Sequence, residues 1–391
     1  MAEVELPALT PQQKENSDRF VSLMRSLIER DGAMPFSEYM HRSLYENGLG
    51  YYVNGFSKLG RHGDFTTAPE TSEHFAVCLA RQCVQVFDEL GQVDILEFGS
   101  GSGQLAADIL NALDPLDKLP ARYCIIEVSP DLQQEQQRLL QQKLSEDVCS
   151  RVCWLQSLPE NFNGVVIANE VLDAFAVERF KMIDGCAQRT MVGFEDGGFI
   201  MHTVEDDQVH NCVLSIQNDL DKNLADDYES EYCALLDPWW QSLADSIDKG
   251  AVLICDYGAD RRRYYAPEKA TGTLRCFFRH TLHDDPFAHP AVQDITADVD
   301  FTAVTIAATA AGLELQGYSP LSEFMLSLDV LQYHQQKLQT LDTREQIQAT
   351  GELKRVIMSQ EMGDRFMVTG FSKALDTTLK GFSRADWSRL L

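Results

Sequence analysis

The stretch Asp94–Asp108 reads DILEFGSGSGQLAAD and carries the clearest structural pattern in this chain. Its first residues form a short apolar run, of the length expected for a strand buried in a parallel sheet. Three glycines follow, at Gly99, Gly101 and Gly103, and apolar residues then recur at helical spacing. Strand, glycine turn and helix in this order predict a backbone that passes close to a ligand. The first amides of the helix would face the same ligand.

Two kinds of ligand fit a glycine turn of this spacing. A dinucleotide loop needs Gly-x-Gly-x-x-Gly/Ala, which Gly101, Gly103 and Ala106 satisfy. The alternative is Glu-x-Gly-x-Gly-x-Gly, in which Glu97 stands inside the strand. A carboxylate suits a pyrophosphate poorly, but it suits the amino group and the sulfonium of S-adenosylmethionine (SAM). Glu97 therefore favours SAM, while a dinucleotide and a turn without any ligand stay open as alternatives.

Composition places the chain among ordinary globular proteins, with 391 residues, 44% hydrophobic and 24% charged. This length is enough for one large domain or two. The net charge of −27 argues against nucleic-acid binding through a basic face, because phosphate contacts need Lys and Arg. The same charge leaves a protein with a basic surface open as a partner.

The ten cysteines include no Cys-x-x-Cys pair and no Cys/His cluster at zinc spacing, so we expect reduced thiols and no metal site. The N-terminal residues lack the apolar core of a signal peptide and the arginines of a transit peptide. No apolar run reaches membrane-spanning length. We therefore expect a cytoplasmic protein without membrane insertion.

Apolar runs that alternate with helical patterns continue along the chain and predict an α/β fold with an open, doubly wound sheet. Seven strands are expected, at 93–98, 123–126, 152–155, 164–168, 251–255, 313–318 and 366–374. Four segments are expected: a helical N-terminal segment, the first half of the core, an inserted cap, and the second half of the core with helical additions. They cover residues 1–60, 61–177, 178–248 and 249–391.

Several shorter segments of the sequence predict local structure or a functional loop. Residues 1–16 are polar and are expected to be a loose leader, and Ser37 is expected to cap a helix over Pro35–Leu44. Asp196-Gly197-Gly198 predicts a hairpin inside the cap. Residues 260–297 show little periodicity, and a run of this length without regular structure is more often functional than not. Four polar residues lie closer together in the sequence than a simple connecting loop requires: Asp64, Thr66, Thr67 and Glu70.

Polar side chains follow two of the predicted strands, where ligands of open α/β sheets bind. Glu127 directly ends the strand at 123–126, the position at which a ribose diol is held, although a surface glutamate is the alternative. Asn169, Glu170 and Asp173 follow the strand at 164–168. One helical turn would present Glu170 and Asp173 together. The alternative is that Asn169 or Asp173 merely caps a helix.

Seven segments in chain order resemble the MidA family of SAM-dependent methyltransferases, from Arg61 to Thr302. They are RHGDFTTAPE, EFGSGSGQLAADIL, IIEVSPDLQQEQ, ANEVLDAFAVERF, CDYG, GTLRCFFRH and DITADVDF. Ala76 and Ala291 depart from the resemblance, because the family usually has glycine there. The resemblance implies a Rossmann-like class I fold in which the last strand runs antiparallel at or near the sheet edge.

The resemblance also implies a set of site residues. Glu97, Gly99, Gly101 and Gly103 match the SAM loop, and Glu127 matches the ribose-binding acid. Asn169, Glu170 and Asp173 match the acidic turn after the fourth strand. The resemblance implies that Asn169 binds the cofactor and that the two carboxylates take part in catalysis. Two more match positions in the long loop and are kept as catalytic candidates: His280 and Asp294.

The mitochondrial member of this family is a complex I assembly factor that methylates an arginine. The resemblance therefore implies a bacterial SAM-dependent methyltransferase that acts on an arginine of a partner protein, with a respiratory-complex subunit among the candidates. Glu170 and Asp173 could hold the guanidinium by paired, charge-assisted hydrogen bonds. An assembly or scaffolding factor that keeps the SAM fold but mainly binds a client is the alternative. The oligomeric state is open, with a homodimer as one option.

Overall fold

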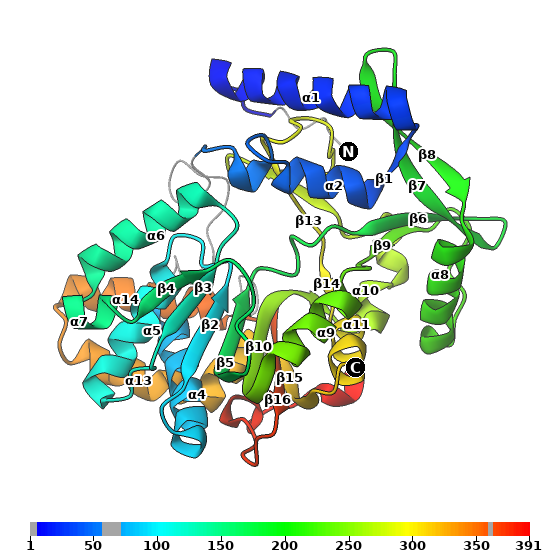
Figure 1. Ribbon diagram of the computed structural model, residues 1–391. Helices are drawn as coiled ribbons and strands as arrows, with labels where there is room; N and C mark the ends of the chain where they lie inside the picture. Colours follow the sequence, from blue (N-terminus) through cyan, green and yellow to red (C-terminus); the bar gives the residue numbers. More distant parts are fainter. Residues whose placement is uncertain (1–5, 57–71, 359–362) are drawn as a thin grey trace. The chain divides into compact units, whose positions relative to one another are not determined.

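The computed structural model describes residues 6–56, 72–358 and 363–391 (Figure 1). Its contacts group the chain into two units. The first unit holds residues 6–56, 173–236 and 259–300, and the second holds 72–172, 237–258, 301–358 and 363–391. The motif RHGDFTTAPE, with its candidates Asp64, Thr66, Thr67 and Glu70, lies outside the described residues.

The second unit is built on a sheet in which strands from distant parts of the chain lie side by side (Figure 1). Seven strands follow the order β15-β16-β10-β5-β2-β3-β4. In chain order they are β2 (Asp94–Phe98), β3 (Tyr123–Ile126), β4 (Val152–Leu155), β5 (Phe162–Asn169), β10 (Ile247–Ala259), β15 (Glu314–Pro320) and β16 (Phe366–Lys373). Each matches a predicted apolar run. Within the described residues this sheet has an eighth strand, β14 (Val299–Asp300), which pairs with β10, so the predicted number of seven is not confirmed.

The last strand, β16, runs antiparallel to both of its neighbours, β10 and β15. It lies one strand in from the edge, which β15 forms. The strands β2, β3, β4, β5 and β10 pair in parallel. Because parallel strands end at one edge of a sheet, the residues that follow β2, β3, β5 and β10 come to the same edge.

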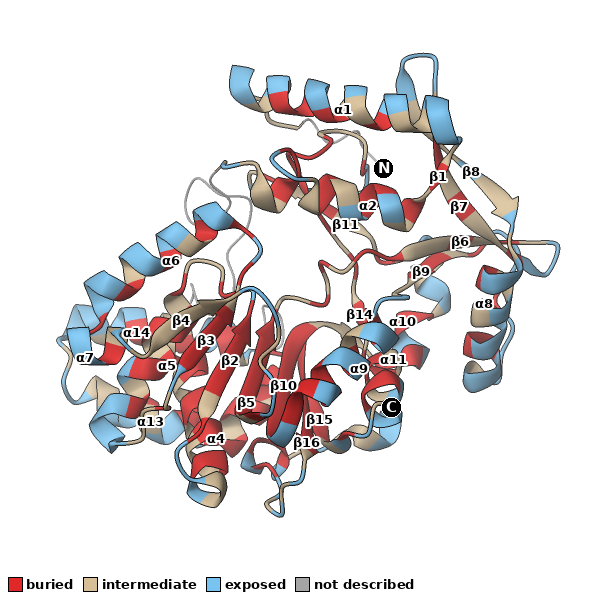
Figure 2. Cartoon of the chain, viewed as in Figure 1, coloured by how far each residue is buried: buried red, intermediate tan, exposed pale blue. Residues whose placement is uncertain are grey.

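The helices of the second unit pack on this sheet or on one another. They are α4 (Glu73–Leu90), α5 (Gln104–Leu113), α6 (Pro130–Lys143), α7 (Glu146–Cys149), α9 (Leu236–Ser246), α11 (Phe301–Ala310), α12 (Leu321–Ser327), α13 (Val330–Leu338) and α14 (Thr343–Ile357). The core joins Leu79 of α4 and Leu110 of α5 to Val165 of β5 and Phe324 of α12. Figure 2 shows β2, β3 and β5 mostly buried, β4 at intermediate exposure, and the outer faces of the helices exposed. Among the residues described, no helix is long and apolar enough to cross a membrane.

The first unit contains two smaller sheets and three helices longer than one turn. The helices are α1 (Pro11–Asp31), α2 (Phe36–Tyr45) and α8 (Asp207–Leu220), with the short α10 at Arg261–Tyr264. The strands are β1 (Met34–Pro35), β6 (Glu178–Ile183), β7 (Cys186–Glu195), β8 (Gly198–Glu205), β9 (Glu229–Tyr232), β11 (Arg275–Phe278), β12 (Thr281–His283), β13 (Asp294–Thr296) and β14 (Val299–Asp300). One sheet has the order β1-β7-β6-β9 with β8 on β7, and the other has the order β12-β11-β13.

Four sequence-based expectations are corrected here. The helix α1 begins at Pro11, not after a leader of sixteen residues, because Thr10 and Gln13 form a capping box. Ser37 does not cap α2; its hydroxyl donates to Glu178 Oε1 at 2.6 Å. The segment 260–297 contains α10 and a three-stranded sheet, whose strands are too short to show a period. Residues 237–248, assigned to the cap, group with the sheet because Trp240 of α9 packs on Phe371 of β16.

Candidate functional site

The glycine turn between β2 and α5 takes the conformation that its sequence predicts. Gly99, Gly101 and Gly103 have φ angles of +59°, +54° and +86°, in the left-handed region that favours glycine. Gly103 is the N-cap of α5, and a Cβ there would lie 3.2 Å from the Cα of Gln136. The predicted strand, glycine turn and helix are therefore confirmed, and the turn leaves little room for a side chain at Gly103.

Glu97 carries a carboxyl group into the buried part of β2. Its side chain is 2% exposed, and its Oε2 accepts hydrogen bonds from Ser100 Oγ at 2.8 Å and Tyr123 Oη at 2.9 Å. The pKa of Glu97 is raised to about 7, mainly by burial and to a smaller extent by the charge of Glu127, while the two hydrogen bonds oppose the shift. Glu97 thus ties the glycine turn to β3 and can change its protonation state near neutral pH.

Glu127 follows β3 directly and is also buried. Its Oε1 accepts from the Ser129 amide at 3.0 Å, and its Oε2 accepts from Gln136 Nε2 at 3.0 Å. The same Nε2 donates to the carbonyl oxygen of Gly101 at 2.9 Å. Gln136 therefore connects the acid at the end of β3 to the glycine turn.

Sequence reasoning did not select Gln136, although the sequence holds a signal for it. The buried positions of α6 are Leu132, Gln136 and Leu140, spaced four residues apart. A glutamine in an apolar stripe at this spacing must find hydrogen-bond partners inside the protein, because burying an unpaired amide is costly.

The residues after β5 form a non-helical turn. Glu170 has a φ of +53°, and its amide donates to the Cys255 carbonyl at 2.9 Å. The amides of Val171 and Leu172 donate to Asp256 Oδ2 at 3.1 and 2.9 Å. The predicted helical turn that presents Glu170 and Asp173 together is therefore wrong, and so is a helix cap at this place.

The turn is not helical because β10 supplies partners for its amides. Asp256 stands fully buried on β10, and no signal within residues 169–175 reveals it. An acidic residue directly after the apolar run at 251–255 is a signal that the sequence offered, because a buried carboxylate needs donors. Asp256 joins Gln136 as a residue of this site that the sequence-based candidate set lacks.

Asn169 is the last residue of β5, and its side chain is 8% exposed. Its Nδ2 donates to Glu170 Oε1 at 3.2 Å. Its buried Oδ1 has no hydrogen-bond partner within the part of the chain that the structure describes. A buried acceptor of this kind calls for a donor, and the amino group of SAM is a donor of the right type. The residues at this edge therefore fit SAM.

Three other candidates lie in the first unit. Asp294 on β13 is buried and accepts from Tyr52 Oη at 3.2 Å. Asp173 is half-buried, its carbonyl accepts from the Ala297 amide, and burial raises its pKa, with a further increase from Asp298. Burial raises the pKa of Tyr52, and both Asp294 and Asp173 add to the shift, so the two carboxyl groups lie near this phenol.

His280 lies at the tip of a hairpin. The strands β11 and β12 pair Phe278 with Thr281, so Arg279 and His280 form a two-residue turn. Their φ angles of +46° and +60° are those of a type I′ turn. The His280 side chain is exposed. The local backbone thus gives His280 a structural position in the turn, and the structure assigns it no partner in catalysis.

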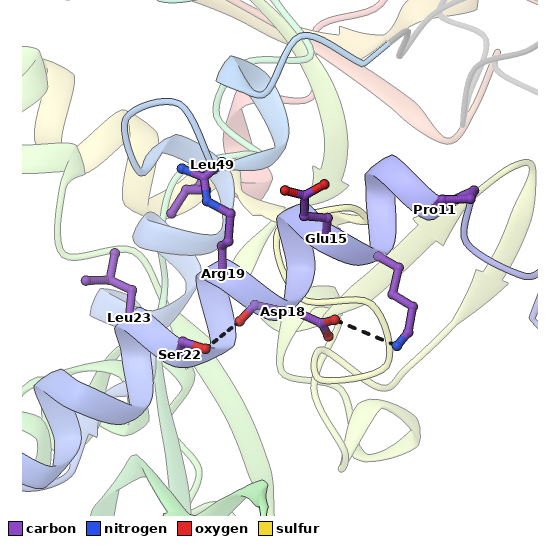
Figure 3. A pocket seen from close by; sticks show the side chains of 8 residues that line it. Pro11, Glu15, Asp18, Arg19, Ser22, Leu23 and Leu49 are labelled. Carbon is purple, nitrogen blue, oxygen red and sulfur yellow. Dashed lines mark hydrogen bonds and ion pairs between the residues drawn. The ribbon is translucent and has the colours of Figure 1, made fainter.

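A pocket of about 680 Å³ also lies in the first unit, along α1 (Figure 3). Figure 3 shows the ion pair between Lys14 and Asp18 and the hydrogen bond from Ser22 to the Asp18 carbonyl. The full lining is Pro11, Lys14, Glu15, Asp18, Arg19, Ser22, Leu23 and Leu49. This lining includes no candidate residue from the sequence, so the pocket is separate from the set described above.

The family model, the solved structure and the two relatives that follow are all described as methyltransferases. A family model of S-adenosyl-L-methionine-dependent methyltransferases matches residues 78–319. A crystal structure from Burkholderia thailandensis, solved with bound S-adenosyl-homocysteine, is 32% identical, with a TM-score of 0.91 over 99% of this chain and 100% of that chain. A Drosophila melanogaster protein named "Protein arginine methyltransferase NDUFAF7 homolog, mitochondrial" is 29% identical over 340 residues, which are 79% of this chain and 74% of that protein. A Danio rerio relative named "Protein arginine methyltransferase NDUFAF7, mitochondrial" is 28% identical over 373 residues, covering 88% and 84% of the two chains.

Proposed function

Because this chain belongs to the family of S-adenosyl-L-methionine-dependent methyltransferases, we propose that it methylates an arginine of a partner protein. The observation that carries the acceptor is the name shared by relatives that match most of the chain, protein arginine methyltransferase. The resemblance stated from the sequence points to a respiratory-complex subunit as a candidate partner. The location in the cytoplasm and the homodimer remain predictions. The two animal relatives carry the word mitochondrial in their names.

The cofactor would be held at the edge where β2, β3 and β5 end. SAM supplies an activated methyl group when bound. Glu127 would accept from a ribose hydroxyl, and Asn169 Oδ1 would accept from the amino group. The backbone of the glycine turn would lie against the cofactor, and Glu97, bonded to Ser100 and Tyr123, would fix that backbone.

The acceptor would be held by carboxylates. Glu170 and Asp173 are proposed to bind the guanidinium, which stays charged at any working pH. Holding the cation orients one nitrogen toward the methyl carbon and offsets the charge that develops as a proton leaves. Asp173 has a raised pKa in the protein alone, and a bound cation would favour its ionised form. Asp294 and His280 keep their place as candidates without an assigned step.

The test replaces each proposed carboxylate with its neutral, nearly isosteric amide. The variants Glu170→Gln and Asp173→Asn should bind S-adenosyl-homocysteine within about twofold of the wild type. Their methylation of a client should fall by about 100-fold or more, the usual effect of losing one charge-stabilising group. Calorimetry measures the binding. Methyl-labelled SAM in a lysate from a knockout strain, followed by acid hydrolysis and detection of methylarginine, measures the transfer.

A matched control is Asp184→Asn, which changes an exposed turn residue of the first unit and should leave both readouts unchanged. Unchanged turnover in both test variants would contradict arginine binding by these carboxylates. A labelled product that releases methanol under mild base would be a methyl ester and would exclude arginine. Full complementation of the knockout by a folded Gly101→Val variant that binds no SAM would support the scaffolding alternative.

A further inference from the structure

Gln136 is a buried residue that hydrogen-bonds to the glycine turn, to Glu127 and to Trp154. It lies on α6, its side chain is fully buried, and both ends of its amide are bonded. Nε2 donates to the Gly101 carbonyl at 2.9 Å and to Glu127 Oε2 at 3.0 Å. Oε1 accepts from Trp154 Nε1 of β4 at 2.8 Å. A primary amide has two N–H donors, and here each one has an acceptor.

Trp154 fixes which way the amide of Gln136 faces. The indole nitrogen can only donate, so it must meet the amide oxygen. The NH₂ group is then forced toward Gly101 and Glu127, both of which present acceptors. A flipped amide would set its oxygen against the carboxylate of Glu127, and it would leave the indole N–H without an acceptor.

The hydrogen bond from Gln136 fixes one oxygen of Glu127, and the Ser129 amide fixes the other. The carboxylate is thus held in one orientation before any ligand arrives. A preorganised acceptor binds more tightly because little rotamer freedom is lost on binding. The same amide holds the Gly101 carbonyl, so the spacing between the glycine turn and Glu127 is fixed by one side chain.

We propose that Gln136 is a positioning residue for ribose recognition, oriented by Trp154 and acting through Glu127. This inference rests on the proposed function, because it requires SAM to bind at this edge. Its specific consequence concerns the ribose hydroxyl. Losing Gln136 should weaken ligands that carry the hydroxyl more than ligands that lack it, whereas a merely structural residue would weaken both equally.

The experiment compares the affinities of S-adenosyl-homocysteine and its 2′-deoxy analogue by calorimetry. In Gln136→Leu, the affinity for S-adenosyl-homocysteine should fall about tenfold, while the affinity for the analogue changes less than about twofold. Trp154→Phe keeps the buried ring but removes the N–H that orients the amide, and its selectivity should fall about threefold. This second variant keeps the test decisive if Gln136→Leu fails to fold.

Gln133→Leu is the matched control on the same helix. Gln133 Nε2 donates to the main-chain carbonyl of Glu127 at 2.6 Å, so it contacts the same residue but not its carboxylate. Its selectivity between the two ligands should equal that of the wild type. Equal losses for both ligands in Gln136→Leu and Trp154→Phe would overturn the inference and leave the proposed function standing. A wild-type protein that binds no S-adenosyl-homocysteine would overturn both.

Discussion

The carboxyl group of Glu97 is buried in the sheet, and the side chains that hydrogen-bond to it there carry hydroxyl groups rather than a cation. Burial disfavours the ionised form, which is why its pKa rises from 4.5 to about 7. The residue keeps its place despite this cost because Ser100 and Tyr123 join it to the glycine turn and to β3. A single buried acid therefore makes the stability of this site depend on pH.

Replacing Glu97 by glutamine should remove that pH dependence. Because the folded protein holds the Glu97 proton more tightly than the unfolded chain, the contribution is fully present below pH 4.5 and is lost as pH rises to about 7. The wild type should lose about 3 kcal/mol of unfolding free energy across this window relative to Glu97→Gln. Urea denaturation at a series of pH values measures the difference. Parallel pH curves for the two proteins would contradict it, and Glu135→Gln on the exposed face of α6 is the control.

The shape of the turn after β5 is set by a neighbouring strand. Asp256 on β10 accepts three amide hydrogen bonds, from Val171, Leu172 and Tyr257. The Cys255 carbonyl on the same strand accepts the amide of Glu170. The proposed guanidinium-binding residue Glu170 thus stands on a turn that β10 holds.

Asp256→Asn should loosen this turn. An asparagine offers one acceptor oxygen, so its NH₂ group must face either the amides of the turn or that of Tyr257. We expect a loss of about 1–3 kcal/mol in unfolding free energy. Hydrogen exchange should also become faster in the peptide that contains Val171 and Leu172. Asp245→Asn, which changes an exposed residue of α9, is the control. Unchanged exchange in that peptide would show that Asp256 does not hold the turn.

The whole molecule is strongly acidic, with a net charge of −27. Exposed acidic residues lie on α8, at the end of β8 before it and in the loop after it: Glu205, Asp207, Asp221 and Asp226. The negative electrostatic field of the protein attracts a basic client protein and repels nucleic acid. Dissolved salt screens this field.

The association rate with an arginine-rich client peptide should therefore fall as salt rises. We expect a decrease of about tenfold or more between roughly 20 and 200 mM salt, because steered association depends steeply on ionic strength. Stopped-flow fluorescence with a labelled peptide measures the rate. A peptide of equal length with glutamine in place of arginine is the control and should show little change. Equal salt dependence for both peptides would mean that the charge of the protein does not guide the encounter.

The sequence alone determined the features that depend on near neighbours in the chain. The strands β2, β3 and β4 lie where their apolar runs predict them, because a short buried strand needs only local apolar residues bounded by turn signals. The hairpin at Asp196-Gly197 and the left-handed glycines after β2 follow from backbone sterics. The position of Glu127 at the end of β3 is likewise a local fact.

Only the tertiary structure decided the features whose hydrogen-bond partners are distant in sequence. Residues 170–172 avoid a helix because Asp256, more than eighty residues later, takes two of their amides. Gln136 acquires its proposed role from Gly101, Glu127 and Trp154, which three different strands bring together around α6. The reason is physical: a buried polar group is satisfied by whichever partner the packing brings to it, and periodicity along the chain carries no record of that partner.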